Sequence, residues 1–180
     1  MRIISGKYKS LTIDVPPGDH VRPTSDRIRE NIFNILDNKY GFEDEYVIDL
    51  FSGSGALGFE AVSRNAKHCL FVDRDARSIN TIKKNAEKLK IDQKTVSIIK
   101  SEVLNFNFES LTQPVKFIFA DPPYDWHHFE ELFLKLKSVG NFENAVLMYE
   151  SEKTYELNFK EHLFDERTYG LTKISLFKIG

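Results

Sequence analysis

The sequence predicts an α/β fold, in which a mostly parallel sheet has helices on both faces and ends in an antiparallel hairpin at the C-terminus. Two observations support this prediction. Between residues 45 and 151, short apolar runs alternate with segments whose apolar residues recur at helical spacing. Such nearly continuous apolar runs are typical of parallel strands that are buried on both faces. After residue 163, two strand-like segments are joined by Gly170 with no helix between them.

The expected strands and helices follow in chain order from the same patterns. Each strand is a short apolar run bounded by polar or turn-forming residues. The seven strands are expected at residues 45–51, 68–73, 95–100, 115–120, 144–151, 164–170 and 171–179. The first helix begins at a cap on Thr24 or Ser25 and ends near Lys39 and Gly41. Three more helices are expected at residues 55–65, 76–89 and 127–137.

Residues 1–23 are expected to form a small extension of the main domain, which covers residues 24–180. Apolar residues on both sides of "SGKYKS" predict a β-hairpin, and the following prolines predict a loop. Residues 1–29 carry six basic side chains against three acidic ones, whereas the whole chain has a formal net charge of −2. This basic front indicates a surface that faces an anionic partner, although an excess of this size also arises by chance.

Composition indicates a single compact domain. The chain has 180 residues, of which 41% are hydrophobic, and this is enough for a packed core. The one cysteine, Cys69, lies in an apolar run, so neither a disulfide framework nor a cysteine-based zinc site is expected. The sequence contains no run of 18 apolar residues and no signal-peptide pattern. We therefore expect a cytoplasmic monomer with no membrane segment and no metal site.

A glycine-rich turn, "DLFSGSGALGFEA", joins the first expected strand to a helix. Gly53, Gly55 and Gly58 match the G-x-G-x-x-G pattern, in which glycines allow a tight turn beside a bound nucleotide. Asp73 ends the next strand, where a carboxylate can accept hydrogen bonds from both hydroxyls of a ribose. NAD and S-adenosylmethionine both fit this arrangement, and so does a tight turn without a ligand. Asp49 would repel a diphosphate but can pair with the amino group of S-adenosylmethionine, which favours the methyl donor.

The segment "DPPY" follows the fourth parallel strand, at the sheet edge where open α/β folds bind ligands. Asp121 and the carbonyl group of Pro122 can each accept one N–H of an exocyclic amine on a planar base. These hydrogen bonds would stabilise the positive charge that develops on the nitrogen during methyl transfer. Tyr124 can stack on a base that has been pulled out of its helix. A proline-rich turn without a ligand is the competing interpretation, and the glycine turn at the same edge argues against it.

These motifs, with "FVDRD" between them, resemble those of class I S-adenosylmethionine-dependent methyltransferases that act on exocyclic amines. The blocks "MRIISGKYKS" and "RPTSDRIRENIFNIL" look like those of the bacterial 16S rRNA (guanine-N2)-methyltransferases of the RsmD type, and the similarity covers nearly the whole chain. The resemblance implies a Rossmann-like fold with seven strands, the last of them antiparallel. It also implies methylation of one guanine N2 in 16S rRNA, within an assembled or assembling small ribosomal subunit, with S-adenosylhomocysteine as the second product.

The resemblance further implies a role for each motif residue. The cofactor would be held by Asp49, Ser52, Gly53, Gly55, Asp73 and Glu102. Glu102, in "KSEV", would lie beside the adenine, where the family usually has an aspartate after a glycine. The guanine would be held by the catalytic residues Asp121, Pro122 and Tyr124. The cofactor rim or the RNA phosphates would be contacted by Arg22, Thr24, Arg27 and Arg29, to which the basic front adds Lys7 and Lys9 as RNA contacts.

Three other functions remain open from the sequence. "DPPY" also occurs in adenine-N6 methyltransferases, which act on RNA or DNA with the same cofactor. An NAD-dependent oxidoreductase would use the glycine turn but has no use for "DPPY". A non-catalytic RNA-binding assembly factor would not need both motifs intact.

Overall fold

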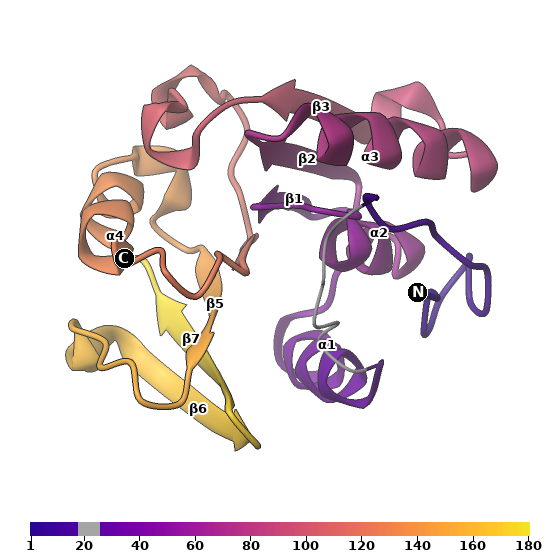
Figure 1. Ribbon diagram of the computed structural model, residues 1–180. Coiled ribbons are helices and arrows are strands. Elements are labelled where there is room, and N and C mark those ends of the chain that lie inside the picture. Colours follow the sequence, from indigo (N-terminus) through magenta and orange to yellow (C-terminus); the bar gives the residue numbers. More distant parts are fainter. Residues whose placement is uncertain (18–25) are drawn as a thin grey trace.

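The computed structural model describes residues 1–17 and 26–180. In this part of the chain a seven-stranded sheet has the order β3-β2-β1-β4-β5-β7-β6 (Figure 1). Its strands are β1 (Tyr46–Leu50), β2 (His68–Asp73), β3 (Val96–Lys100), β4 (Phe117–Ala120), β5 (Val146–Glu152), β6 (Leu163–Tyr169) and β7 (Thr172–Lys178). Strands β1 to β5 are parallel, and β7 is antiparallel to both β5 and β6. The predicted sheet with its antiparallel C-terminal hairpin is confirmed.

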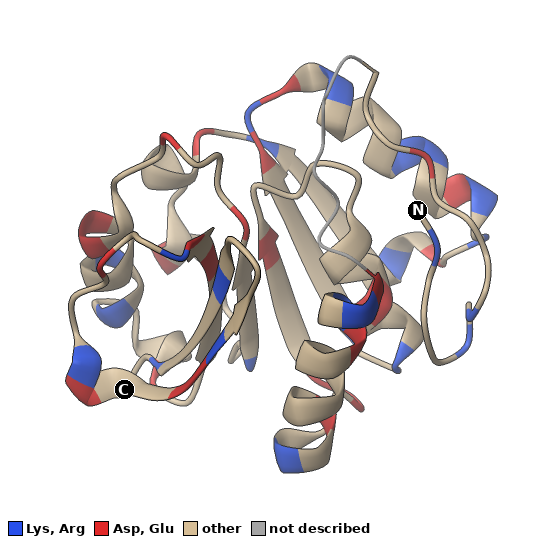
Figure 2. Cartoon of the chain, turned by 60° about the horizontal axis from the view of Figure 1, so that its bottom comes forward, with Lys and Arg blue, Asp and Glu red and all other residues tan. Residues whose placement is uncertain are grey.

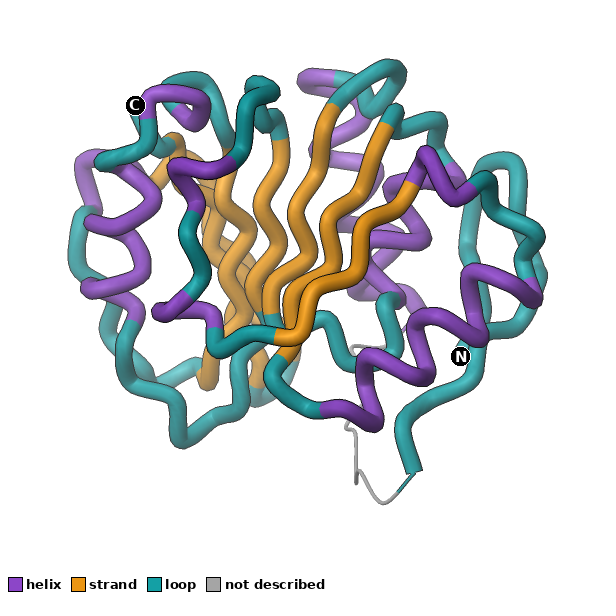
Figure 3. The backbone as a smooth tube through the Cα atoms, turned by 90° about the horizontal axis from the view of Figure 1, so that it is seen from above, coloured by secondary structure: helices purple, strands orange, loops and turns teal. Residues whose placement is uncertain are grey.

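Helices cover both faces of the sheet (Figure 3). Within the described residues the α-helices are α1 (Asp26–Tyr40), α2 (Ala56–Ser63), α3 (Ala76–Lys88) and α4 (Phe129–Lys137). Short 3-10 turns are found at Gln93–Thr95, Val103–Asn105, Phe108–Ser110, Gly140–Phe142 and Lys160–His162. Helices α1, α2 and α3 pack into one hydrophobic core, and α4 packs into a second core on the other face.

Alternate residues of the central strands belong to the two cores. In β4, Phe117 and Phe119 lie in the core of α1 to α3, whereas Ile118 and Ala120 lie in the core of α4. Both faces of the strand are therefore apolar, which explains its unbroken hydrophobic sequence. The alternation of side chains continues just past the end of a strand. The side chain of a polar residue at that position therefore lies on a defined face of the sheet.

The chain reverses direction at its N-terminus as expected, but the β-pairing there is limited to a single bridge between Arg2 and Thr12. The backbone bonds to α2 instead of to a second strand. The buried carboxylate of Glu60 accepts the N–H of Ile4 at 2.8 Å and the N–H of Ser5 at 3.1 Å. A buried side chain thus provides the acceptors that a longer hairpin would have supplied.

The first 17 residues, here called the N-terminal segment, share the core of the main domain. Ile3 and Ile13 are buried in the core of α1 to α3. The side chain of Asn85 in α3 donates to the carbonyl oxygen of Asp14 at 3.0 Å and accepts the Asp14 N–H at 2.8 Å. The domain boundary expected at residue 23 lies outside the described residues. Across the part of the chain that the structure describes, no helix is long and apolar enough to cross a membrane.

Candidate active site

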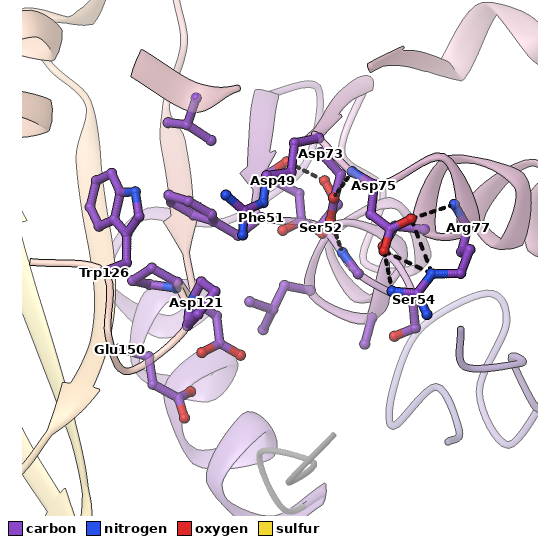
Figure 4. A pocket seen from close by; sticks show the side chains of 18 of the residues that line it. Asp49, Phe51, Ser52, Ser54, Asp73, Asp75, Arg77, Asp121, Trp126 and Glu150 are labelled. Atoms are coloured by element: carbon purple, nitrogen blue, oxygen red, sulfur yellow. Dashed lines mark hydrogen bonds and ion pairs between the residues drawn. The ribbon is translucent and has the colours of Figure 1, made fainter. Parts of the chain in front are cut away.

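A cavity of about 500 Å³ lies at the carboxyl ends of the parallel strands (Figure 4). This volume is in the range typical of sites for cofactors and small molecules. Its walls come from the glycine-rich turn after β1, the end of β2, and the segments that follow β3 and β4. The predicted cofactor-binding and base-binding residues that line it are Asp49, Ser52, Gly53, Asp73, Glu102, Asp121, Pro122 and Tyr124. The two predicted motifs therefore meet in one cavity.

The turn between β1 and α2 contains three residues in the left-handed conformation. Phe51, Gly53 and Gly55 have φ angles of 56°, 52° and 80°. This conformation strains Phe51, which carries a side chain, and such strain is concentrated at functional sites. A Cβ atom on Gly55 would lie 2.6 Å from the ring of Phe59, so glycine is required there. Gly55 thus shapes the turn without being one of the residues that line the cavity.

Two carboxylates hold this turn against the sheet. Asp73 accepts the N–H groups of Gly53 and Asp75, each at 2.8 Å. Asp49 is 1% exposed and accepts the N–H of Gly58 at 2.8 Å. Burial raises the pKa of Asp49 well above its usual value, the hydrogen bond from Gly58 opposes this shift, and Asp73 adds to it. Each carboxylate oxygen has a further lone pair with which it can accept a hydrogen bond from a ligand.

Two other predicted cofactor residues have distinct positions. The Ser52 hydroxyl donates to the carbonyl oxygen of Asp49 at 2.5 Å and accepts the N–H of Val72 at 2.9 Å. This side chain therefore fastens the turn to β2. Glu102 lies at the rim, where its half-exposed carboxylate is 3.4 Å from the guanidinium of Arg74. The rim position leaves Glu102 open to the solvent as well as to the cavity.

A second pair of carboxylates, Asp121 and Glu150, lines the cavity on the side away from Asp73 (Figure 4). Ala120 of β4 pairs with Tyr149 of β5, so Asp121 and Glu150 are neighbours one residue further on. Asp121 is half-buried and Glu150 is 5% exposed. Burial raises the pKa of Asp121 well above its usual value, and the nearby acidic side chains, first Glu150, raise it further. Glu150 is not among the predicted site residues, although a glutamate at the end of the apolar run "NAVLMYES" is a signal for one.

Aromatic rings form one wall of the cavity. Tyr124 is 40% exposed and lines the cavity, so its ring is accessible to a ligand. The rings of Phe51 and Trp126 pack edge to face with centroids 4.8 Å apart. Flat aromatic faces of this kind favour planar ligands. Phe51 and Trp126 are absent from the sequence prediction, because only the fold brings them together.

Arg29 is the one predicted basic residue, within the described part of the chain, that lines the cavity. It is 1% exposed, and its guanidinium donates to the carbonyl oxygen of Arg2 at 2.6 Å and to the Asp26 carboxylate at 3.0 Å. Burial lowers the pKa of Arg29, and the charge of Asp26 opposes that shift. Its Nε has no hydrogen-bond partner among the described residues. The burial of Arg29 disfavours a contact with RNA at the surface and favours the alternative, a contact with the cofactor.

The other basic candidates lie elsewhere. Lys7, Lys9 and Arg27 are exposed and lie outside the cavity. Figure 2 shows Lys and Arg residues in the N-terminal segment and on the helices, interspersed with Asp and Glu. Arg22 and Thr24 lie outside the described residues. Among the residues that are described, no group of three or more His, Cys, Asp or Glu is arranged to hold a metal ion.

Comparison with known proteins identifies the family. The family model described as "Conserved hypothetical protein 95" matches residues 1–178. "Ribosomal RNA small subunit methyltransferase D" of Haemophilus influenzae is 34% identical over 183 residues, which cover 99% of this chain and 93% of that protein. The Escherichia coli K12 protein of the same name is 35% identical over 153 residues, or 84% of this chain and 75% of that protein. The solved structure of yhhF from Escherichia coli matches with a TM-score of 0.82 and 29% identity, covering 99% of this chain and 97% of that one. The chain therefore belongs to this family, the RsmD type of class I S-adenosylmethionine-dependent methyltransferases.

Proposed function

We propose that the protein transfers a methyl group from S-adenosylmethionine to the exocyclic N2 amine of a guanine in 16S rRNA. The supporting observation is the shared cavity, in which the glycine turn and Asp73 face the segment from Asp121 to Tyr124. A methyl donor on the first side and an extruded base on the second would meet between them. Relatives named as ribosomal RNA small subunit methyltransferases agree with this substrate.

In this proposal the cofactor lies against the glycine turn. Asp73 would accept the ribose hydroxyls with its remaining lone pairs, and Glu102 and the buried Val103 would flank the adenine. Asp49 would face the amino group of the methionine part. The Nε of Arg29 is a donor that suits the carboxylate of the same part, because a guanidinium binds carboxylates well.

S-adenosylmethionine supplies a methyl group bound to a positively charged sulfur. Asp121 and the carbonyl group of Pro122 would hold the two hydrogens of the amine, and the negative charge of Asp121 would stabilise the positive charge that develops on nitrogen. Because its pKa is raised, Asp121 is also a better proton acceptor than an ordinary aspartate, and it would take the proton that the nitrogen releases. Tyr124 would stack on the guanine.

The RNA would approach over the exposed basic residues. Lys7, Lys9 and Arg27 would contact phosphates and position the target, because phosphate contacts fix register rather than select a base. The formal net charge of −2 limits indiscriminate binding to nucleic acids. We place the reaction in the cytoplasm, on an assembled or assembling small ribosomal subunit, with the enzyme acting as a monomer.

Methylation of defined particles tests the proposal. Small ribosomal subunits from a strain that lacks this enzyme are incubated with the protein and labelled S-adenosylmethionine, and their RNA is digested to nucleosides for mass spectrometry. We expect label in N2-methylguanosine at one position of 16S rRNA. Asp121→Ala, checked for cofactor binding by calorimetry, is the inactive control.

The same measurement separates the proposed function from two of its rivals, an adenine methyltransferase and an assembly factor. Label in N6-methyladenosine, from RNA or from added DNA, would support an adenine methyltransferase and contradict the proposal. A protein that binds the particles but transfers no methyl group to free rRNA, to particles or to DNA would be an assembly factor. The strain itself provides a second check, because its 16S rRNA should lack one N2-methylguanosine that the parent strain contains.

A further inference from the structure

Glu150 is a buried acidic residue to which the proposed reaction assigns no task. It is 5% exposed and lies near the carboxyl end of β5. It lines both the main cavity and a second cavity of about 170 Å³. The two cavities share the wall formed by residues 122–124 and Trp126. A buried carboxylate that faces a ligand cavity is a candidate for substrate recognition.

The strand register places Glu150 beside Asp121 on one face of the sheet. Phe119 of β4 pairs with Met148 of β5, and both belong to the core of α1 to α3. Two residues further along, the alternation of side chains puts Asp121 and Glu150 on that same face. Figure 4 shows both carboxylates pointing into the same part of the cavity. The contribution of Glu150 to the raised pKa of Asp121 agrees with this proximity.

We propose that Glu150 selects guanine by accepting its N1–H, while Asp121 holds the neighbouring N2 amine. This inference rests on the proposed function, methylation of a guanine amine. The N1–H and the N2 amine are adjacent on one edge of guanine, as the two carboxylates are adjacent in the cavity. An ionised carboxylate accepts hydrogen bonds and donates none, so the pair matches the N1–H and the N2 amine, which are adjacent donors.

The same pair excludes adenine. Adenine presents its exocyclic amine beside N1, which carries a lone pair and no hydrogen. With the amine on Asp121, that lone pair would face the Glu150 carboxylate, and two acceptors repel each other. A site built to bond a substrate N–H rejects an analogue without it by large factors. Glu150 would therefore supply the base selectivity that "DPPY" alone does not.

A base analogue isolates the N1–H contact. Small subunits are reconstituted with ligated 16S rRNA that carries either guanosine or 2-aminopurine riboside at the methylated position. 2-Aminopurine keeps the exocyclic amine at carbon 2 but has a lone pair at N1. We expect the wild-type enzyme to methylate guanosine about 100-fold faster or more, with cofactor saturating. Glu150→Gln, whose amide can donate to a bare N1, should reduce this preference about tenfold or more.

The matched control is Glu143→Gln, an exposed residue that precedes the other end of the same strand. It removes the same charge and should keep the wild-type preference. An unchanged preference in Glu150→Gln, or equal wild-type rates on the two bases, would overturn the assignment of Glu150. A wild-type enzyme that leaves guanosine unmethylated would instead contradict the proposed function. If Glu150→Gln fails a melting or cofactor-binding check, the wild-type comparison of the two bases decides alone.

Discussion

Asp121→Asn is expected to stabilise the fold and to slow the reaction, which are opposite effects of one charge. Burial and the nearby acidic side chains, first Glu150, raise the pKa of Asp121, so the folded state favours the neutral acid. At pH 8 a carboxyl group whose folded-state pKa is raised therefore destabilises the native protein, and a neutral amide of the same shape removes that cost. A single stabilising substitution commonly gives about 0.5–2 kcal/mol. For a domain of this length 1 kcal/mol corresponds to about 2–4 °C in melting temperature.

The stability gained by Asp121→Asn depends on pH, and the raised pKa of Asp121 determines the direction of this dependence. A raised folded-state pKa means that the cost is present above that pKa and disappears as the pH falls towards the unfolded value, about 3.9. Melting curves from pH 5 to pH 8 should therefore show the advantage of Asp121→Asn shrinking as the pH falls. Asp125→Asn, an exposed neighbour, should change stability by less than about 0.5 kcal/mol at every pH. A less stable Asp121→Asn at pH 8, or an advantage that grows on acidification, would refute the electrostatic reasoning.

The second half of this prediction is that substitutions of Asp121 slow the methyl transfer itself. Single-turnover methyl transfer to small subunits, with cofactor saturating, measures the step without product release. Asp121→Ala should lose on the order of 100-fold or more, because a preorganised partner of the developing charge is removed. Asp121→Asn keeps an acceptor oxygen and should retain part of the rate. Full activity in Asp121→Ala would show that the carboxylate does not take part in the reaction.

Three further experiments test the remaining parts of the site. Asp73→Ala should weaken S-adenosylmethionine binding by about 1–3 kcal/mol in calorimetry, since the ribose hydroxyls lose their charged acceptor; unchanged affinity would contradict that role. Replacing Lys7, Lys9 and Arg27 with Ala should weaken RNA binding and reduce its salt slope by about 2–3, one unit for each lost phosphate contact, whereas an identical slope would leave these residues as a solvated face. Tyr124→Ala should lose about 1–3 kcal/mol of base stacking while Tyr124→Phe is nearly neutral, and equal losses would indicate a role for the hydroxyl.

The strands and helices are predictable because the local pattern of apolar residues identifies each of them. Strands such as β2 and β4 are buried on both faces, so their apolar runs stand out from the amphipathic helices between them. The N-terminal segment is predicted less well. Its local sequence indicates a hairpin, but the acceptors for its N–H groups come from Glu60, which is 56 residues away from Ile4 in the chain. Local pattern carries no information about such a distant partner.

The residues of the site also differ in how well the sequence predicts them. Asp49, Asp73 and Asp121 are predictable as cavity residues because each lies at or next to the end of a strand, and the carboxyl ends of parallel strands meet at one edge. The sequence leaves Arg29 between a contact with the cofactor rim and a contact with the RNA, and its burial in the structure favours the cofactor. Glu150 escapes prediction because β5 is one more apolar strand until its pairing with β4 brings this residue beside Asp121.

The charges of the molecule are separated in a way that fits a base-modifying enzyme. Acidic side chains outnumber basic ones in the described lining of the cavity: Asp49, Asp73, Asp75, Glu102, Asp121 and Glu150 against Arg29, Arg74 and Arg77. The exposed residues Lys7, Lys9 and Arg27 lie outside it. A cavity lined this way attracts the positively charged cofactor and the N–H donors of a base, and it repels phosphate groups. A nucleotide can place its base in the acidic cavity and its phosphates on the basic surface only if the base turns inward, away from its backbone. In the proposed reaction, this charge distribution therefore favours a base that has left its helix.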